Sequence, residues 1–316
     1  LRDGVLLRLD GQGRQVRVAG VPAVEAAGQG GLLDVLVPRD FAQSRAVFLS
    51  YAKRQGNGAG TALAAARLAS DGRSLADLRV IFEMAPGSRG GRHFGSRIVE
   101  LRDGTLALTI GDRGNDRLAQ DLTRHEGTVV RINRDGSVPA DNPFVGRTDA
   151  RPEIWSWGHR NPQGAALDAQ GRLWVSEHGP RGGDEVNLVQ KGANYGWPRV
   201  THGVSYSGLP ISNRTSAPEY ADPFHVWVPS IAPSGHAIAS GRMFPAWRGH
   251  HLIGSLNSNL IAVLDPAGRG ASGWAETRIE TAETARVRDV REAPDGSIWF
   301  SAENAGAIFR MAAPGA

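Results

Sequence analysis

Cysteine is absent from the chain, which excludes disulfide bonds, thiolate catalysis and cysteine-bound metals. Lysine is nearly absent as well, since it occurs only at Lys53 and Lys191, and no tract of Lys and Arg is typical of nucleic-acid binding. No apolar run approaches the ~20 residues that span a bilayer. With a net charge of only +4, we expect a mildly basic surface, no nucleic-acid partner and no membrane span.

Sequence motifs of several enzyme classes are missing too. No Gly-x-Ser-x-Gly elbow occurs, so a serine hydrolase has no support. The nine histidines include no His-Glu-x-x-His zinc motif. The loop Gly111-Asp112-Arg113-Gly114 lacks the third glycine of a dinucleotide-binding motif. Spacing alone therefore selects no catalytic histidine and favours no dinucleotide cofactor.

Glycine, in contrast, is abundant: 41 of the 316 residues are glycine, or 13%, against ~7% in an average protein. Short runs rich in Val, Ile, Leu and aromatic residues follow turn signals such as Arg102-Asp103-Gly104, Ala169-Gln170-Gly171 and Pro294-Asp295-Gly296. No sustained 3.6-residue periodicity with caps accompanies them. This pattern predicts an all-β fold of short strands joined by tight turns.

A weak internal repeat indicates the architecture. Equivalent strands begin at Arg45, Thr105, Arg172, His250 and Ser297. Their spacing of about 50–80 residues suits a four-stranded propeller blade. A sixth equivalent strand would lie before Leu1, so we expect the first blade to be incomplete at the N-terminus. An ordinary β-sandwich with unequal loops is the alternative to a propeller. No linker divides the chain, which predicts one domain over 1–316.

The densest polar segment runs over residues 155–208. Within it, Glu177–Glu185 combines carboxylates with a Gly/Pro backbone, and Ca²⁺ binds about 6–8 oxygen ligands of these kinds. A flexible turn with solvated acids is the alternative on the residues alone. Arg286 and Arg288 would share one face of a strand, which suits a polyanionic ligand, although a solvated strand face explains them as well.

Three longer motifs carry a family resemblance: Gly-His-Arg-Asn-Pro-Gln-Gly at 158–164, Glu-His-Gly-Pro-Arg-Gly-Gly-Asp-Glu at 177–185 and Asn-Tyr-Gly-Trp-Pro at 194–198. The chain resembles the soluble pyrroloquinoline-quinone (PQQ)-dependent aldose sugar dehydrogenases, the glucose/sorbosone dehydrogenase family. The resemblance implies a six-bladed β-propeller of four-stranded antiparallel blades. It also implies a quinoprotein that oxidises aldoses at the anomeric carbon to the lactone with bound PQQ and Ca²⁺.

The resemblance assigns roles to individual residues. His93 matches the general base, and Arg160 is expected to take part in catalysis and in quinone binding. The carbonyls of Gly179 and Pro180 match ligands of a catalytic calcium. Glu185 and Tyr195 match a second, structural calcium site, Tyr195 through its backbone carbonyl. The residues expected to bind the quinone are Gln29, Arg160, Asn161, Tyr206, Asn257, Arg286 and Arg288.

Two positions depart from the family pattern. Asn257 stands where relatives commonly carry lysine, and an amide can hydrogen-bond the quinone but brings no charge. Glu303 stands where relatives often carry aspartate. Asn257 favours one alternative, a quinone-free propeller that binds a partner. A calcium-dependent, lactonase-like hydrolase is another, because calcium and a base can activate water.

The resemblance also bears on partners and location. We expect a small aldose substrate, an external electron acceptor, and a periplasmic or secreted protein whose leader has been removed before Leu1. The sequence indicates neither the preferred aldose, nor the natural acceptor, nor the oligomeric state.

Overall fold

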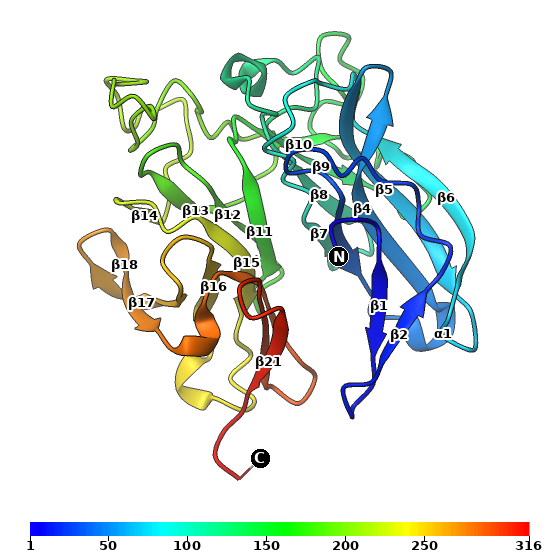
Figure 1. Cartoon of the computed structure of the whole chain (residues 1–316). Coiled ribbons are helices and arrows are strands. Elements are labelled where there is room, and N and C mark those ends of the chain that lie inside the picture. The colour runs from blue at the N-terminus through cyan, green and yellow to red at the C-terminus, as the bar shows by residue number, and fades with distance from the viewer. Residues whose placement is uncertain (316) are drawn as a thin grey trace. The chain divides into compact units, whose positions relative to one another are not determined.

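The computed structural model describes residues 1–315, and these consist mainly of strands and turns (Figure 1). In this part of the chain the only α-helix is α1 (Phe41–Ser44), and three 3-10 helices cover Asp116–Gln120, Pro245–Trp247 and Ala282–Thr284. The predicted all-β class is therefore confirmed. None of the helices in residues 1–315 is long and apolar enough to cross a membrane.

The chain divides into two compact units, Leu1–Asn161 and Pro162–Ala316, each described here by itself. This division does not test the expectation of a single domain over 1–316, which stays a prediction.

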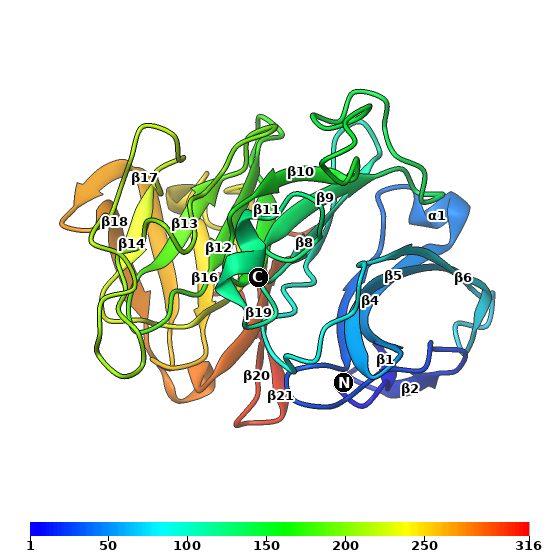
Figure 2. The same ribbon diagram turned by 90° about the horizontal axis from the view of Figure 1, so that it is seen from above.

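The first unit contains two four-stranded antiparallel sheets and a ribbon, and in each sheet consecutive strands are neighbours. The first strands of the two sheets, β3 and β7, pack against each other. Figure 2 shows β4, β5 and β6 side by side as long strands. The ribbon is β1 (Leu6–Leu9) and β2 (Gln15–Val18), and the sheets are β3 (Leu32–Leu36), β4 (Ala46–Gln55), β5 (Gly58–Leu68), β6 (Leu75–Glu83), and β7 (Ile98–Glu100), β8 (Leu106–Ile110), β9 (Thr128–Ile132), β10 (Ile154–Trp157).

The second unit contains three antiparallel sheets of the same kind, and their first strands β11, β15 and β19 pack against one another in turn. The strands are β11 (Pro162–Leu167), β12 (Leu173–Glu177), β13 (Asp184–Leu188), β14 (His225–Trp227); β15 (Pro233–Ile238), β16 (His251–Ser255), β17 (Ile261–Gly270), β18 (Gly273–Ile279); and β19 (Val287–Glu292), β20 (Ile298–Ala302), β21 (Ala307–Met311).

The predicted number of six blades is wrong. Residues 1–315 form five sheets of blade type, and the residues before β3 form only the two-stranded ribbon β1–β2. The first of these sheets, β3–β6, has all four strands, and the expected incomplete blade at the N-terminus stays a prediction. The sheet with three strands is the last one, β19–β21. The predicted equivalence of five strands is confirmed. They are β4, β8, β12, β16 and β20, and each is the second strand of its sheet in chain order.

The predicted turn signals lie between the first and second strands of three sheets. Gly104, Gly171 and Gly296 each adopt a positive φ of 81–87°, which only glycine enters without strain. Each donates its N–H to a carbonyl three residues earlier, at 2.8–3.1 Å. The same turn therefore recurs at corresponding places, and the second strand of each sheet begins immediately after it.

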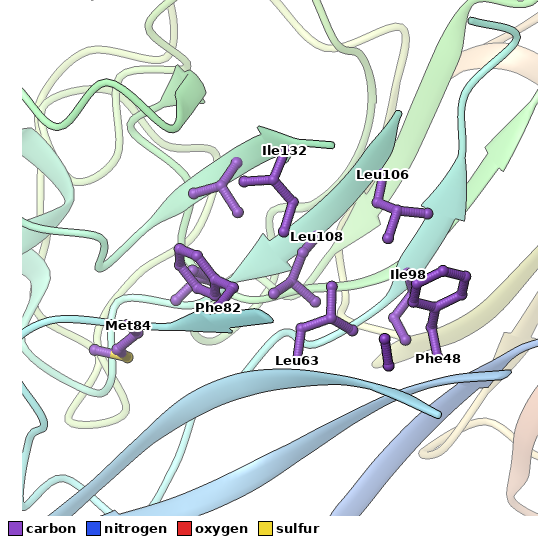
Figure 3. Close-up of a cluster of buried hydrophobic side chains, with 11 residues drawn as sticks. Phe48, Leu63, Phe82, Met84, Ile98, Leu106, Leu108 and Ile132 are labelled. Atoms are coloured by element: carbon purple, nitrogen blue, oxygen red, sulfur yellow. The ribbon is translucent and has the colours of Figure 1, made fainter. Parts of the chain in front are cut away.

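The core of the first unit lies between its two sheets (Figure 3). Leu63 of β5 and Leu106 and Leu108 of β8 are fully buried there and point toward one another with the other labelled side chains. Burying such apolar surface is the main stabilising term of the fold. It also fixes the end of β8, where the loop that begins at Gly111 leaves the sheet.

Candidate active site

In the first unit, a histidine and a carboxylate lie on two loops that approach closely. His93 Nδ1 is 2.6 Å from Asp112 Oδ1, and Asp112 follows the end of β8. A Cβ on Gly111 would collide with the carbonyl oxygen of His93, so the approach requires glycine there. Because an ionised carboxylate only accepts hydrogen bonds, Nδ1 carries the proton and Nε2 keeps the lone pair.

The loop around His93 is held in an unusual backbone conformation. His93 itself has a φ of 53°, in the left-handed region that a non-glycine residue seldom adopts. Its backbone N–H donates to Gln29 Oε1 at 2.7 Å, and the Gln29 N–H donates to the Gly91 carbonyl at 2.7 Å. Gln29, which the resemblance places beside quinone and substrate, thus holds the backbone of the His93 loop.

Arg160 and Asn161 join the same group of loops. The Arg160 carbonyl accepts the Asp112 N–H at 2.8 Å, and Asn161 Oδ1 accepts the Gly95 N–H at 3.2 Å. Both side chains are buried. The structure thus brings together four of the predicted residues, Gln29, His93, Arg160 and Asn161, within the first unit.

The environment of His93 favours the neutral imidazole. Burial lowers the pKa of His93 most, the Asp112 carboxylate raises it, and the positive charges of Arg160 and Arg92 lower it further. The net pKa lies below the usual 6.5. At neutral pH the ring is therefore an unprotonated base with Nε2 available to accept a proton.

In the second unit, Asp184 organises the loop that contains Gly179 and Pro180. Its side chain is fully buried and accepts the Gly179 N–H at 2.8 Å, the Ser230 hydroxyl at 2.6 Å, and the N–H groups of Ile231 and Ala232 at 2.8 Å. Burial raises the pKa of Asp184, and these hydrogen bonds oppose that shift. One carboxylate thus fixes the predicted calcium loop to the segment before β15.

Glu185 belongs to a cluster of buried polar groups. Glu177 of β12 lies directly opposite Glu185 of β13, and Asn187 lies on the same face two residues later. Asn187 Nδ2 donates to both carboxylates, at 3.0 and 3.2 Å, while its buried Oδ1 has no hydrogen-bond partner. Burial and the Glu177 carboxylate raise the pKa of Glu185 to about 8. Like charges in this position destabilise the pair unless a cation or a proton compensates them.

This cluster fits a divalent cation only with additional oxygen ligands. Among residues 1–315, no three His, Asp or Glu side chains converge as a metal site. Two carboxylates and the unpartnered Asn187 Oδ1 are nevertheless the oxygen donors that Ca²⁺ prefers, and backbone carbonyls commonly complete its coordination. The phenol of the predicted Tyr195 faces elsewhere: it donates to the Leu188 carbonyl and accepts the Gln190 N–H at 2.9 Å.

The predicted arginine pair meets at one carboxylate. Arg286 Nε is 2.5 Å from Glu303 Oε2, and Arg288 Nε is 2.6 Å from Glu303 Oε1. Arg286 Nη1 also donates to the Leu256 carbonyl at 3.0 Å, and Arg288 Nη1 to Gln163 Oε1 at 3.1 Å. The side chains of Arg286 and Arg288 are about 40% exposed, so two positive charges face one carboxylate at a site that solvent reaches. A polycarboxylate ligand fits such a pair.

Asn257 and Tyr206 are both exposed. Asn257 Nδ2 donates weakly to the Ser230 carbonyl at 3.4 Å, and Ser230 also bonds to Asp184. Tyr206 lies in the loop that Val204 attaches to Arg181 through two backbone hydrogen bonds at 3.0 and 3.2 Å. A continuous chain of contacts thus runs in the second unit from the Gly179–Pro180 loop through Ser230 toward Asn257.

The glucose/sorbosone dehydrogenase family model matches residues 1–310. This chain belongs to that family of dehydrogenases. It is 41% identical over 306 residues to aldose sugar dehydrogenase YliI of Escherichia coli K12. The matched region covers 95% of this chain and 82% of YliI. A crystal structure of glucose dehydrogenase has a TM-score of 0.94 at 41% identity, covering 99% of this chain and 91% of the other. The PQQ-bound aldose sugar dehydrogenase of Streptomyces coelicolor has a TM-score of 0.78 at 26% identity, covering 97% and 84%.

These similarities confirm the predicted family and the coarse fold, a β-propeller of antiparallel blades, here with five sheets of blade type. Sequence reasoning assigned no individual role to four polar residues of this family member, Asp112, Glu177, Asp184 and Asn187, although Glu177 and Asp184 lie within the segment considered for calcium. A usable signal existed, because Asp112 and Glu177 lie at the ends of β8 and β12, two strands already aligned by the repeat. Glu303 follows β20 in the same way.

Proposed function

We propose that this protein oxidises aldoses at the anomeric carbon to the corresponding lactone, with PQQ as redox cofactor and Ca²⁺. The observation that carries the proposal is the partly buried, neutral His93, oriented by Asp112, in a member of a dehydrogenase family. Oxidising the anomeric C–H and O–H requires a base for the hydroxyl proton and an acceptor for the hydride. His93 Nε2 is suited to take that proton.

The chain's own residues have separable tasks in this proposal. Asp112 keeps the proton of His93 on Nδ1 and stabilises the imidazolium after proton transfer. Arg286 and Arg288 would bind carboxylates of the quinone, and Arg160 and Asn161 would hydrogen-bond its polar atoms. The Gly179 and Pro180 carbonyls would bind one calcium, and Glu185 with the Tyr195 carbonyl a second. Once bound, the quinone supplies the two-electron acceptor that no side chain provides.

Reconstitution tests this proposal. Purified protein is incubated with PQQ and Ca²⁺, and reduction of an artificial dye is followed with several aldoses. We expect dye reduction that depends on the quinone, on the metal and on the sugar. Folded, reconstituted protein without dye reduction would refute the enzyme proposal, and quinone binding without turnover would favour a binding protein. Lactone hydrolysis without quinone would instead favour the hydrolase alternative.

A histidine substitution tests the assigned base. His93→Ala should still bind PQQ, detected by its absorbance, but should lose turnover. His250 provides a matched control, because its Nε2 also lies beside a carboxylate, 3.3 Å from Asp265 Oδ1, without any proposed role. His250→Ala should keep turnover, and unchanged turnover in His93→Ala would refute the role of His93.

The periplasmic or secreted location and the external electron acceptor stay predictions.

A further inference from the structure

Arg113, the neighbour of Asp112, is a buried arginine that no part of the proposed reaction uses. Only 1% of its surface is exposed, and it is the largest of the fully buried side chains. Its φ of 59° lies in the left-handed region, and Gly114, which follows directly, also has a positive φ of 78°. Burying a guanidinium is expensive unless its donors are paired, so its position calls for a physical explanation.

The contacts of Arg113 concentrate on the segment that contains His93. Its Nε donates to Ser88 Oγ at 3.1 Å, and its Nη1 donates to the Arg92 carbonyl. Its guanidinium carbon stands 3.3 Å from the centroid of the Phe94 ring, a cation–π contact. Arg113 therefore holds the residues on both sides of His93.

The backbone of Arg113 approaches the same segment. A Cβ on Gly90 would collide with the carbonyl oxygen of Arg113, so the two loops are in direct contact there. Asp112 and Arg113 thus act on one loop in different ways. Asp112 binds the imidazole ring of His93, and Arg113 holds the backbone at Arg92 and the ring of Phe94.

Stability alone does not explain this arrangement. Burial lowers the pKa of Arg113 to about 10, although the charges of Glu126 and Asp112 oppose the shift, so the group stays charged at neutral pH. Its Nη2 is buried without a hydrogen-bond partner. An unsatisfied buried donor destabilises the folded state, and an apolar side chain of similar size would avoid this loss.

We propose that Arg113 is a positioning residue that fixes the His93 loop so that the ring of His93 meets Asp112 in a single orientation. This inference rests on the proposed role of His93 as the base. The left-handed backbone of His93 is strained and needs such support from its surroundings. A planar fork that donates to two groups while stacking on a ring suits arginine and not lysine.

The test compares three variants of the complete chain. Arg113→Met removes the charge and the fork at similar volume, and Arg113→Lys keeps the charge only. Arg131→Met is the matched control, because Arg131 is also buried in the first unit and also lies over an aromatic ring, 4.9 Å from the centroid of Trp155. It pairs with Asp103 and Asp141 and not with the His93 loop.

The first readout is the imidazole NMR spectrum of quinone-free protein, with the His93 signals assigned by His93→Ala. In the parent, the Nδ1 proton bonded to Asp112 should give a resolved downfield signal. In Arg113→Met and Arg113→Lys this signal should shift or broaden, and the pKa of His93 should fall because the raising effect of Asp112 weakens. Arg131→Met should leave the signal and the pKa unchanged. This readout does not depend on turnover.

The second readout is kinetic. A shift of about 1 Å in a catalytic group can lower kcat about 10²-fold, so both Arg113 variants should lose kcat while KM changes less than about threefold. A parental His93 signal in folded Arg113→Met and Arg113→Lys would overturn the inference, as would an equal change in Arg131→Met. Shifted His93 signals in a protein that never reduces dye would refute the proposed function but leave the positioning by Arg113 intact.

Discussion

The single carboxylate that fixes the Gly179–Pro180 loop offers a sharp prediction, the replacement Asp184→Asn. Asp184 Oδ1 accepts one hydrogen bond, from the Gly179 N–H, and Oδ2 accepts three, from Ser230, Ile231 and Ala232. Asparagine has nearly the same shape but replaces one acceptor oxygen with an NH₂ group. Its best orientation keeps the three bonds and turns the NH₂ group toward the Gly179 N–H.

The magnitude follows from these four bonds. Losing one hydrogen bond to a charged acceptor costs about 1.5–3 kcal/mol, and the other three become weaker neutral bonds. Relief from burying a charge offsets part of this loss. We therefore expect a loss of about 3 kcal/mol in the free energy of unfolding. For a unit of this size that loss corresponds to about 6–12 °C in Tm.

Thermal unfolding followed by circular dichroism, in the presence of a chelator, measures this loss without any bound metal. Asp295→Asn is the control, since the exposed Asp295 accepts the Ser297 N–H at 2.9 Å in a turn that asparagine can also form. Its ion pair with Arg310, at 3.1 Å, lies on the surface, where such pairs contribute little. Its Tm should stay close to that of the parent. Calcium titration should then show weaker binding in Asp184→Asn, because Gly179 is no longer held. A Tm within 2 °C of the parent, with parental calcium affinity, would refute the organising role of Asp184.

Asp112→Asn should lower kcat about 100-fold, because an amide no longer enforces the Nδ1 proton. Since Asp112 raises the pKa of His93, the acidic limb of the kcat/KM profile should move to lower pH, and an unmoved limb would contradict this. Glu303→Gln should tighten PQQ binding about threefold, because the exposed arginine pair loses its competing carboxylate, and weaker binding in a titration would show that Glu303 orients the pair. Glu185→Gln should raise the Tm measured in chelator, because it removes the like-charge repulsion between Glu177 and Glu185. It should also abolish the increase in Tm that excess Ca²⁺ causes in the parent. A Ca²⁺-dependent rise equal to that of the parent would exclude this metal site.

The sequence predicted the repeating parts of the fold best, because local chemistry determines them. Turns such as that at Gly104 depend on one positive φ, and the strand after each turn is a short apolar run, so both are legible in the chain. The repeat located five equivalent strands, which matches the five sheets of blade type, and the sixth blade was expected from the family resemblance. The residues before β3 pair as a ribbon, whose pattern of single strands and turns resembles that of a blade.

The site residues show the opposite limit. His93 could be selected among nine histidines only through the family motif, because its left-handed backbone and its contact with Asp112 join segments that are 19 residues apart. Glu177 and Glu185 are opposite each other only because β12 and β13 pair in one register. A shift by one residue would turn one carboxylate to the other face of the sheet. The buried charges of this protein are therefore set by strand register and loop contacts, which the chain specifies through its packing and not through local pattern.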